Sequence, residues 1–121
     1  MNGLLHGLRV LDVSSVLAGP MTGSFLAECG AEVLKVEAPG GDVTRTWRAK
    51  GEPGNRTSAY HAAANTGKST VRQDLKSEDG QAWLHEALST TDVLLQNMKW
   101  QDLDRMGLLP TSLLAKFPRL I

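Results

Sequence analysis

The first candidate for chemistry is the segment N-T-G-K-S-T at residues 65–70, which resembles a phosphate-binding loop. The full loop motif needs a second glycine five residues before Gly67, where this chain has Ala62. The motif also needs a strand before it and a helix after it, whereas an alanine-rich segment precedes the string and a strand-like one follows. The sequence therefore disfavours a nucleotide triphosphatase. A contact between Lys68 and an anion stays open, but these residues alone favour an exposed lysine in a turn.

The other reactive side chains show no catalytic or metal-binding arrangement. The three histidines lack the spacing of metal ligands: His6, His61 and His85. Of these, His61 is expected to be a structural residue with satisfied hydrogen bonds. The single Cys29 excludes an intramolecular disulfide and a cysteine-rich zinc site, and Ser14 and Ser15 have no recognisable base. These patterns predict no catalytic residue and no metal site.

The elements that must position these residues open with a β-α-β unit. Residues 8–13 form a short apolar, strand-like run, and residues 14–19 form a turn. Pro20 suits the first position of a helix, which we expect to end at Gly30, before a second strand at residues 32–37. The turn at 14–19 follows the carboxyl end of a strand, which is where open α/β sheets bind ligands. A ligand site is therefore expected there.

The apolar side chains of this β-α-β unit indicate which sides of its helix and of its second strand are apolar. The helix places Met21, Phe25 and Leu26 on one side. The second strand alternates in polarity, with Val33 and Leu34 expected to point inward.

The middle of the chain predicts a long loop, a strand, a helix and another strand. The loop at residues 38–57 contains Trp47, which we expect to pack against another residue. A strand follows at 69–75, and Ser77 is expected to cap a helix with acidic residues in its first turn. This helix buries a stripe made of Trp83, Leu84, Ala87 and Leu88.

The rest of the chain continues the alternation of strands and helices. A fourth strand is expected at 92–96, short helices at 103–106 and 111–116, and the beginning of a strand at 119–121. This pattern predicts an α/β, Rossmann-like fold with a largely parallel sheet and flanking helices, as a single domain over residues 1–121.

Composition and charge exclude several functional classes. The 121 residues carry 13 basic and 13 acidic side chains, so a general nucleic-acid-binding protein is not expected. No apolar run approaches the ~20 residues of a membrane span, and no signal segment is visible, so we expect a cytoplasmic protein with no membrane partner. The charges are nevertheless unevenly distributed along the chain. Residues 41–76 carry seven basic and three acidic side chains, whereas residues 77–104 carry one basic and six acidic side chains. The basic segment could attract a small polyanion, although solvated surface charge explains it equally well.

A series of short motifs is distinctive when taken in order. The motifs are G-L-R-V-L-D-V-S at 7–14, V-L-A-G-P-M at 16–21, G-A-E-V-L-K-V-E at 30–37, G-G-D-V-T-R at 40–45, N-T-G-K-S-T-V at 65–71, D-L-K-S-E-D-G at 74–80, T-D-V-L-L-Q-N at 91–97 and L-D-R-M-G-L at 103–108. Together they resemble the amino-terminal part of the family III coenzyme A transferases, the family of formyl-CoA transferase, carnitine–CoA transferases and α-methylacyl-CoA racemase. The resemblance extends over essentially the whole chain.

The resemblance implies a coenzyme A or acyl-CoA site on a Rossmann-like domain. In that family this domain binds the nucleotide, and two chains interlock as a dimer. The implied contact residues lie in the first turn, at two later strand ends and on one short helix: Val16, Leu17, Ala18, Gln73, Asp74, Leu75, Lys76, Asn97, Met98, Lys99 and Arg105. Arginine and lysine at strand ends suit the phosphates of coenzyme A.

Two positions depart from the family pattern. The family often places an arginine directly after the glutamate that matches Glu37, where this chain has Ala38. The usual E-N-F-x-P-G segment is here Q-N-M-K-W-Q at residues 96–101, without the aromatic residue and the Pro-Gly turn. Both changes are expected to weaken coenzyme A binding.

The resemblance also places the family's catalytic aspartate well beyond Ile121. We therefore expect a truncated, transferase-like domain that binds coenzyme A, is inactive alone, and forms a homodimer without the family's interlocked ring. The alternative is a structural or interaction module with a vestigial site, which self-associates or binds another chain.

Overall fold

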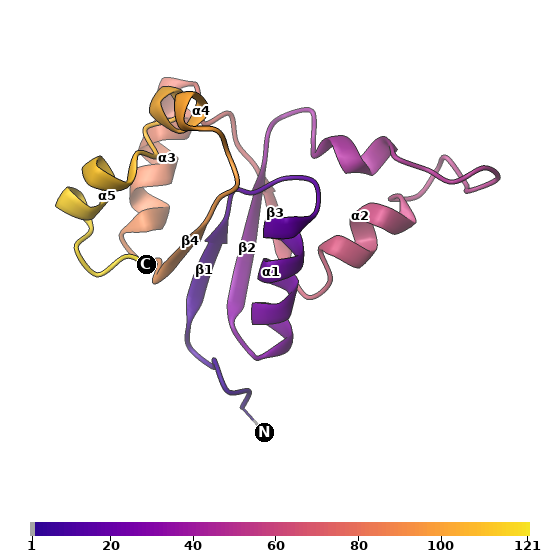
Figure 1. The fold of residues 1–121 in the computed structure, drawn as a ribbon, viewed down its shortest axis with the longest axis horizontal. Helices are drawn as coiled ribbons and strands as arrows, with labels where there is room; N and C mark the ends of the chain where they lie inside the picture. Colours follow the sequence, from indigo (N-terminus) through magenta and orange to yellow (C-terminus); the bar gives the residue numbers. More distant parts are fainter. Residues whose placement is uncertain (1) are drawn as a thin grey trace.

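The computed structural model describes residues 2–121 and contains a four-stranded parallel sheet (Figure 1). The strands are β1 (Arg9–Asp12), β2 (Glu32–Glu37), β3 (Ser69–Arg72) and β4 (Val93–Leu95). Their order in the sheet is β3-β2-β1-β4, so β1 and β2 are the central pair. The predicted α/β fold with a parallel sheet is confirmed.

Helices connect the strands, as the alternation predicted. The helical elements are α1 (Ala18–Glu28), the short 3₁₀ turn η1 (Val43–Thr46), α2 (Ala59–Ala64), α3 (Glu78–Leu88), α4 (Trp100–Arg105) and α5 (Pro110–Lys116). Ser77 caps α3 as expected, because its side chain accepts a hydrogen bond from the backbone N–H of Gly80. Trp47 packs edge-on against Tyr60 of α2, with ring centroids 5.3 Å apart, so the expected contact is also confirmed.

The two central strands bury both of their faces. Val10 and its register partner Val33 pack on the side of α1, whereas Leu11 packs with Leu84 and Leu88 of α3. Val33 and Leu34 therefore both point inward as predicted, but toward opposite faces of the sheet, because successive side chains of a strand alternate.

Helix α1 differs from its prediction at its beginning. It begins at Ala18 with Leu17 as the N-cap residue, so Pro20 is the third helical residue and not the first. Proline is still tolerated there, because the first turn of a helix has no internal partner for its backbone N–H groups.

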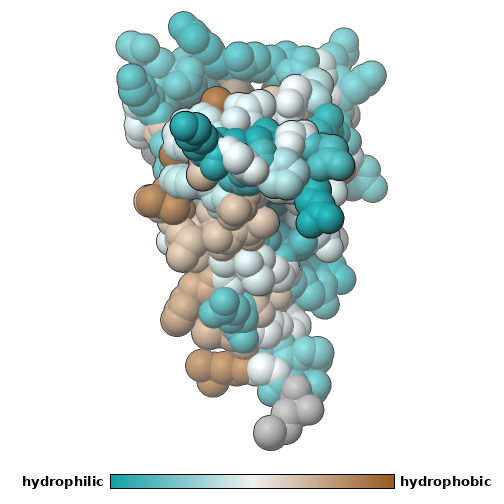
Figure 2. Space-filling model, turned by 90° about the vertical axis from the view of Figure 1, so that its right-hand side faces the viewer, coloured by the Kyte–Doolittle hydropathy of each residue, from teal (hydrophilic) through white to brown (hydrophobic). Residues whose placement is uncertain are grey.

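The buried face of α1 is made of small residues. Pro20, Gly23 and Ser24 are buried, whereas Met21 and Phe25 are 47% and 64% exposed. A Cβ atom on Gly23 would lie 2.8 Å from a carboxylate oxygen of Asp12, so larger side chains do not fit on this face. Figure 2 shows hydrophobic side chains gathered on part of the surface on this side of the molecule. The three apolar residues expected on one side of α1 are therefore divided: Met21 and Phe25 face solvent, whereas Leu26 packs against the sheet.

The end of the described chain continues the sheet. The backbone N–H of Ile121 donates to Asp92, and the N–H of Leu94 donates to Ile121 (3.0 and 2.9 Å). The expected strand beginning at residues 119–121 thus pairs beside β4. Within residues 2–121, the structure contains no helix with the length and apolar character needed to cross a bilayer.

Candidate functional site at the carboxyl edge of the sheet

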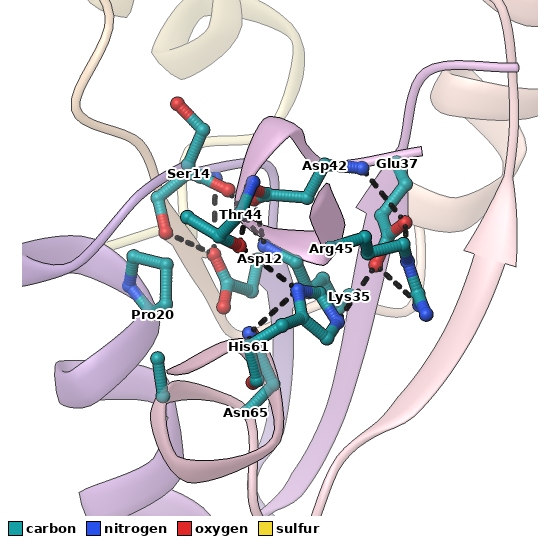
Figure 3. Close-up of polar contacts among 12 residues, drawn as sticks. Asp12, Ser14, Pro20, Lys35, Glu37, Asp42, Thr44, Arg45, His61 and Asn65 are labelled. Atoms are coloured by element: carbon teal, nitrogen blue, oxygen red, sulfur yellow. Dashed lines mark hydrogen bonds and ion pairs between the residues drawn. The ribbon is translucent and has the colours of Figure 1, made fainter. Parts of the chain in front are cut away.

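Buried charged side chains gather where β1 and β2 end (Figure 3). Asp12, Lys35 and Glu37 point to the same face of the sheet, because Asp12 and Lys35 are register partners and Glu37 follows Lys35 by two residues. Asp12 and Lys35 are fully buried, and Glu37 is almost so. Buried charges need partners, and among residues 2–121 the structure leaves no buried side-chain nitrogen or oxygen without one.

Lys68 supplies the partner for Asp12. Its ammonium lies 2.7 Å from Asp12 Oδ2 and also donates to the backbone carbonyl of Pro20 (2.7 Å) and to Asn65 Oδ1 (2.9 Å). Burial lowers the pKa of Lys68, and the attraction of Asp12 only partly opposes that effect. The expectation of an exposed turn lysine is wrong, because the side chain has 0% exposure. An anion contact is equally unsupported, since this ammonium faces protein oxygens.

The same network holds the turn between β1 and α1. Asp12 Oδ1 accepts hydrogen bonds from the backbone N–H (2.9 Å) and the hydroxyl of Ser14. Asn97, which follows β4, donates to the carbonyl of Ser15 (2.7 Å) and accepts from its N–H (3.0 Å). Between these clamps Val16 has φ = 71°, a strained conformation for a β-branched residue. The turn is therefore held in one shape from two sides.

A second buried pair fixes the loop after β2. Lys35 lies 3.3 Å from Asp42 Oδ2 and donates to the carbonyl of Ser14 at 2.9 Å. Asp42 Oδ1 accepts from the backbone N–H of Thr44 (2.9 Å) and from its hydroxyl (2.7 Å), so it caps η1. Burial by itself would raise the pKa of Asp42, but the bonds from Thr44 and the charge of Lys35 outweigh it and lower that pKa.

Glu37 joins this loop to α2. Its carboxylate accepts two hydrogen bonds from Arg45 (2.7 and 2.8 Å), and His61 Nε2 lies 3.4 Å away. Burial opposes ionisation of Glu37, yet the bonds from Arg45 and from the backbone of Asp42 leave its pKa lowered. His61 is buried, with its other ring nitrogen 3.0 Å from the hydroxyl of Thr44, and this burial lowers the pKa of His61. The expectation of a structural histidine is confirmed.

A pocket of about 370 Å³ opens above this network at the carboxyl edge. Its walls come from segments that follow β1, β2, β3 and β4: Val13, Ser14, Ser15, Val36, Glu37, Ala38, Gly41, Asp42, Val43, Gln73, Asp74, Leu75, Lys76, Met98 and Met106. Five of the residues implied by the family resemblance are therefore brought together here: Gln73, Asp74, Leu75, Lys76 and Met98.

The other six implied residues lie outside the pocket lining. Val16, Leu17 and Ala18 form the strained turn and the start of α1, while Asn97 clamps that turn and Lys99 precedes α4. Arg105 ends α4, is exposed, and lies 3.8 Å from Asp102.

Sequence reasoning missed the contribution of the loop after β2. Gly41, Asp42 and Val43 line the pocket, whereas the family resemblance points only to the position of Ala38 in this loop. The signal was available: A-P-G-G-D follows a predicted strand at the same edge of the sheet as the turn at 14–19.

A larger hollow of about 900 Å³ lies at the opposite edge of the sheet. Its lining includes Arg9, Glu32 and Ser69, the first residues of three strands, together with Trp83 and Ala87 of α3. Parallel sheets bind ligands at the carboxyl ends of their strands, so the smaller pocket is the candidate functional site.

The sequence pattern of CoA-transferase family III matches residues 5–121 of this chain. The chain belongs to CoA-transferase family III. A succinate–glutarate CoA-transferase of Agrobacterium fabrum is 43% identical over 97% of this chain, and the human succinyl-CoA:glutarate CoA-transferase is 40% identical over 86% of it. The crystal structure of a CAIB/BAIF family protein from Brucella suis matches 100% of the chain with a TM-score of 0.89 and 39% identity.

These family III proteins are much longer than this chain. It spans 30% of the Agrobacterium protein, 24% of the human protein and 32% of the Brucella chain. The similarity therefore concerns one part of each relative.

Proposed function

We propose that the pocket at the carboxyl edge binds coenzyme A or acyl-CoA. The observation that carries this proposal is the convergence on one pocket of segments that follow all four strands, in a chain of a family named for CoA transfer. Open parallel sheets bind nucleotide-like ligands at this edge. The pocket is smaller than coenzyme A as a whole, so we expect it to hold one part of the ligand, with the remainder along the rim.

The rim offers backbone and cationic groups for the phosphates of coenzyme A. The turn at Val16, Leu17 and Ala18 presents backbone at the start of α1, and Lys76 contributes a cation from the pocket wall. Asn97, Met98, Lys99 and Arg105 extend the same edge along the segment after β4. Cationic side chains bind phosphate through charge-assisted hydrogen bonds. We expect the binding to be weak, because Ala38 adds no charge to the rim.

We further propose that these 121 residues do not transfer acyl groups by themselves. A transferase of the kind expected here needs a free carboxylate as its nucleophile. Glu37 and Asp42 are buried and bonded to Arg45, Lys35 and Thr44, so they are not free carboxylates. The third carboxylate of the pocket, Asp74, is exposed and accepts a hydrogen bond from the backbone N–H of Lys76 (3.1 Å), so Asp74→Asn is the variant against which any observed turnover should be tested. Turnover of acyl-CoA that survives repurification of the chain would contradict this part of the proposal.

Calorimetric titration with coenzyme A tests the binding proposal. We expect binding that weakens as salt rises, since exposed phosphate contacts are screened. Arg105→Ala should weaken binding more than Arg119→Ala, which changes an exposed arginine at the opposite edge of the sheet. The absence of heat and of a thermal shift at millimolar coenzyme A would overturn the proposal.

One observation favours a second candidate, self-association through α1. Leu17, Met21 and Phe25 are spaced four residues apart and are 48%, 47% and 64% exposed. Residues at this spacing form one continuous stripe along a helix. A second copy of the chain would present the same stripe, and a two-fold contact would cover both at once. We therefore propose a homodimer that forms through the α1 stripe.

A further inference from the structure

The turn after β2 forms an open part of the pocket rim. Ala38 and Gly41 line the pocket, and the backbone N–H of Gly41 donates to the carbonyl of Ala38 (2.8 Å). Gly41 has φ = 82°, and no atom lies within 4 Å of the position of a Cβ on Gly40. The backbone is therefore open at Gly40, whereas the side chains of Glu37, Arg45 and Arg72 lie beside Gly41.

Arg72, the last residue of β3, lies alongside this turn. It is the register partner of Glu37, and its Nη1 donates to the carbonyl of Pro39 at 3.2 Å. Its Nη2 lies 3.4 Å from the position of a Cβ on Gly41. The guanidinium therefore lies beside Gly41, which lines the pocket, although Arg72 itself is not among the lining residues.

Arg72 differs from its neighbour Arg45 in the partners of its guanidinium group. Arg45 also approaches Gly41, but both arms of its guanidinium are bonded to the carboxylate of Glu37. Within residues 2–121, Arg72 has no ion-pair partner and donates only to a neutral carbonyl. The Glu37 carboxylate, which also lies beside Gly41, is already paired with Arg45, and most of the five N–H donors of Arg72 are available.

We infer that Arg72 binds a phosphate group of the ligand at this rim. The planar guanidinium matches phosphate in a bidentate geometry, and its exposure lets it adjust to the ligand. The inference rests on the proposed function and adds a residue to it: Arg72 is the cation that serves the turn after β2, where Ala38 carries none. The phosphate is either the diphosphate or the terminal 3′-phosphate of coenzyme A, two groups of the same chemistry.

Titrations of the unmodified chain, Arg72→Gln and the control Arg119→Gln test this inference, with coenzyme A, dephospho-coenzyme A and pyrophosphate as probes. Arg72→Gln should weaken coenzyme A binding about ten-fold, the size of one charge-assisted hydrogen bond. Arg72→Lys should restore part of the loss, and Arg119→Gln should bind normally. If Arg72 binds the 3′-phosphate, the loss disappears with dephospho-coenzyme A. If it binds the diphosphate, the loss persists with that ligand and with pyrophosphate.

Failure of the inference and failure of the proposed function give different results. Unchanged coenzyme A binding by Arg72→Gln overturns the inference and leaves the proposed function standing. Pyrophosphate binding that depends on Arg72, in a chain that does not bind coenzyme A, overturns the function and supports the inference. Binding of neither probe by the unmodified chain overturns both. Thermal melts should show that every variant is folded, because Arg72 is exposed.

Discussion

The ammonium of Lys68 lies 2.7 Å from Asp12 Oδ2, and both side chains are fully buried. This contact joins the end of β1 to the turn after α2, 56 residues further along the chain. The other carboxylate oxygen of Asp12 accepts a hydrogen bond from the backbone N–H of Ser14, at the start of the turn that leads to the proposed ligand site. One buried ion pair thus links the sheet, the turn after α2 and the edge that carries the candidate site.

Removal of one partner from this ion pair should strongly destabilise the folded protein. Lys68→Met leaves the Asp12 carboxylate buried without a countercharge, and we expect a loss of about 3–5 kcal/mol in the free energy of unfolding. The double variant Asp12→Asn with Lys68→Met should lose clearly less, because it buries no charge. Urea unfolding measures both, with the exposed Lys76→Met as control. A loss below about 1 kcal/mol for Lys68→Met would contradict the proposed role, since that is the range of exposed pairs.

The stability of the protein should fall as pH is lowered from 7 to 5. Burial lowers the pKa of His61 in the folded protein below its ordinary value of 6.5, so the unfolded chain binds the additional proton first. The contribution is therefore fully present above about pH 6.5 and is lost as pH falls through the lowered value. Denaturant unfolding across this range should show a smaller slope for His61→Gln, and an unchanged slope for His6→Gln, which alters an exposed residue.

Further acidification should act through the buried carboxylates. Glu37 and Asp42 have lowered pKa values in the folded protein, so their contribution is present above their ordinary values of 4.5 and 3.8 and is lost below them. A stability that stays constant between pH 7 and pH 5 would contradict the His61 prediction, and one that stays constant from pH 5 to pH 2 would contradict this one.

The strained turn predicts an unusual response to glycine. Val16→Gly should stabilise the fold by about 1 kcal/mol, because glycine adopts a positive φ at no steric cost. Leu17→Gly should destabilise it instead, since Leu17 has φ = −135° and gains nothing from the change. Thermal unfolding compares the two. Destabilisation by Val16→Gly would show that contacts of the valine side chain outweigh the strain.

The α1 stripe predicts the oligomeric state. Phe25→Glu places a charge on the most exposed residue of the proposed contact and should convert the dimer to a monomer, as measured by light scattering. Thr22→Glu changes a neighbouring exposed residue of the same helix and should leave the dimer intact. A monomeric mass for the unmodified chain at high micromolar concentration would rule out the self-association proposal.

The order of elements followed from local sequence signals. Apolar runs of strand length, the Ser77 cap and the apolar stripe of α3 each depend on residues within a few positions of one another. The edge that carries the candidate site followed as well, because parallel strands all place their carboxyl ends at the same side. The resemblance to family III proteins, and not a local pattern, grouped Gln73 and Lys76 with Met98. The structure places all three in the lining of the pocket, and their part in binding stays a prediction.

Only the tertiary structure decided which charges are buried and which apolar residues are exposed. Lys68 lies in a turn and looks like a surface lysine, but the distant Asp12 stabilises its burial. That buried pair leaves no room for a side chain at Gly23 of α1, and Met21 and Phe25 of the same helix face solvent. The amino-acid sequence by itself determined the fold class and the sheet edge that carries the candidate site, because local periodicity and strand direction are short-range properties. The partners of each charge were decided by contacts between segments tens of residues apart, which no local pattern contains.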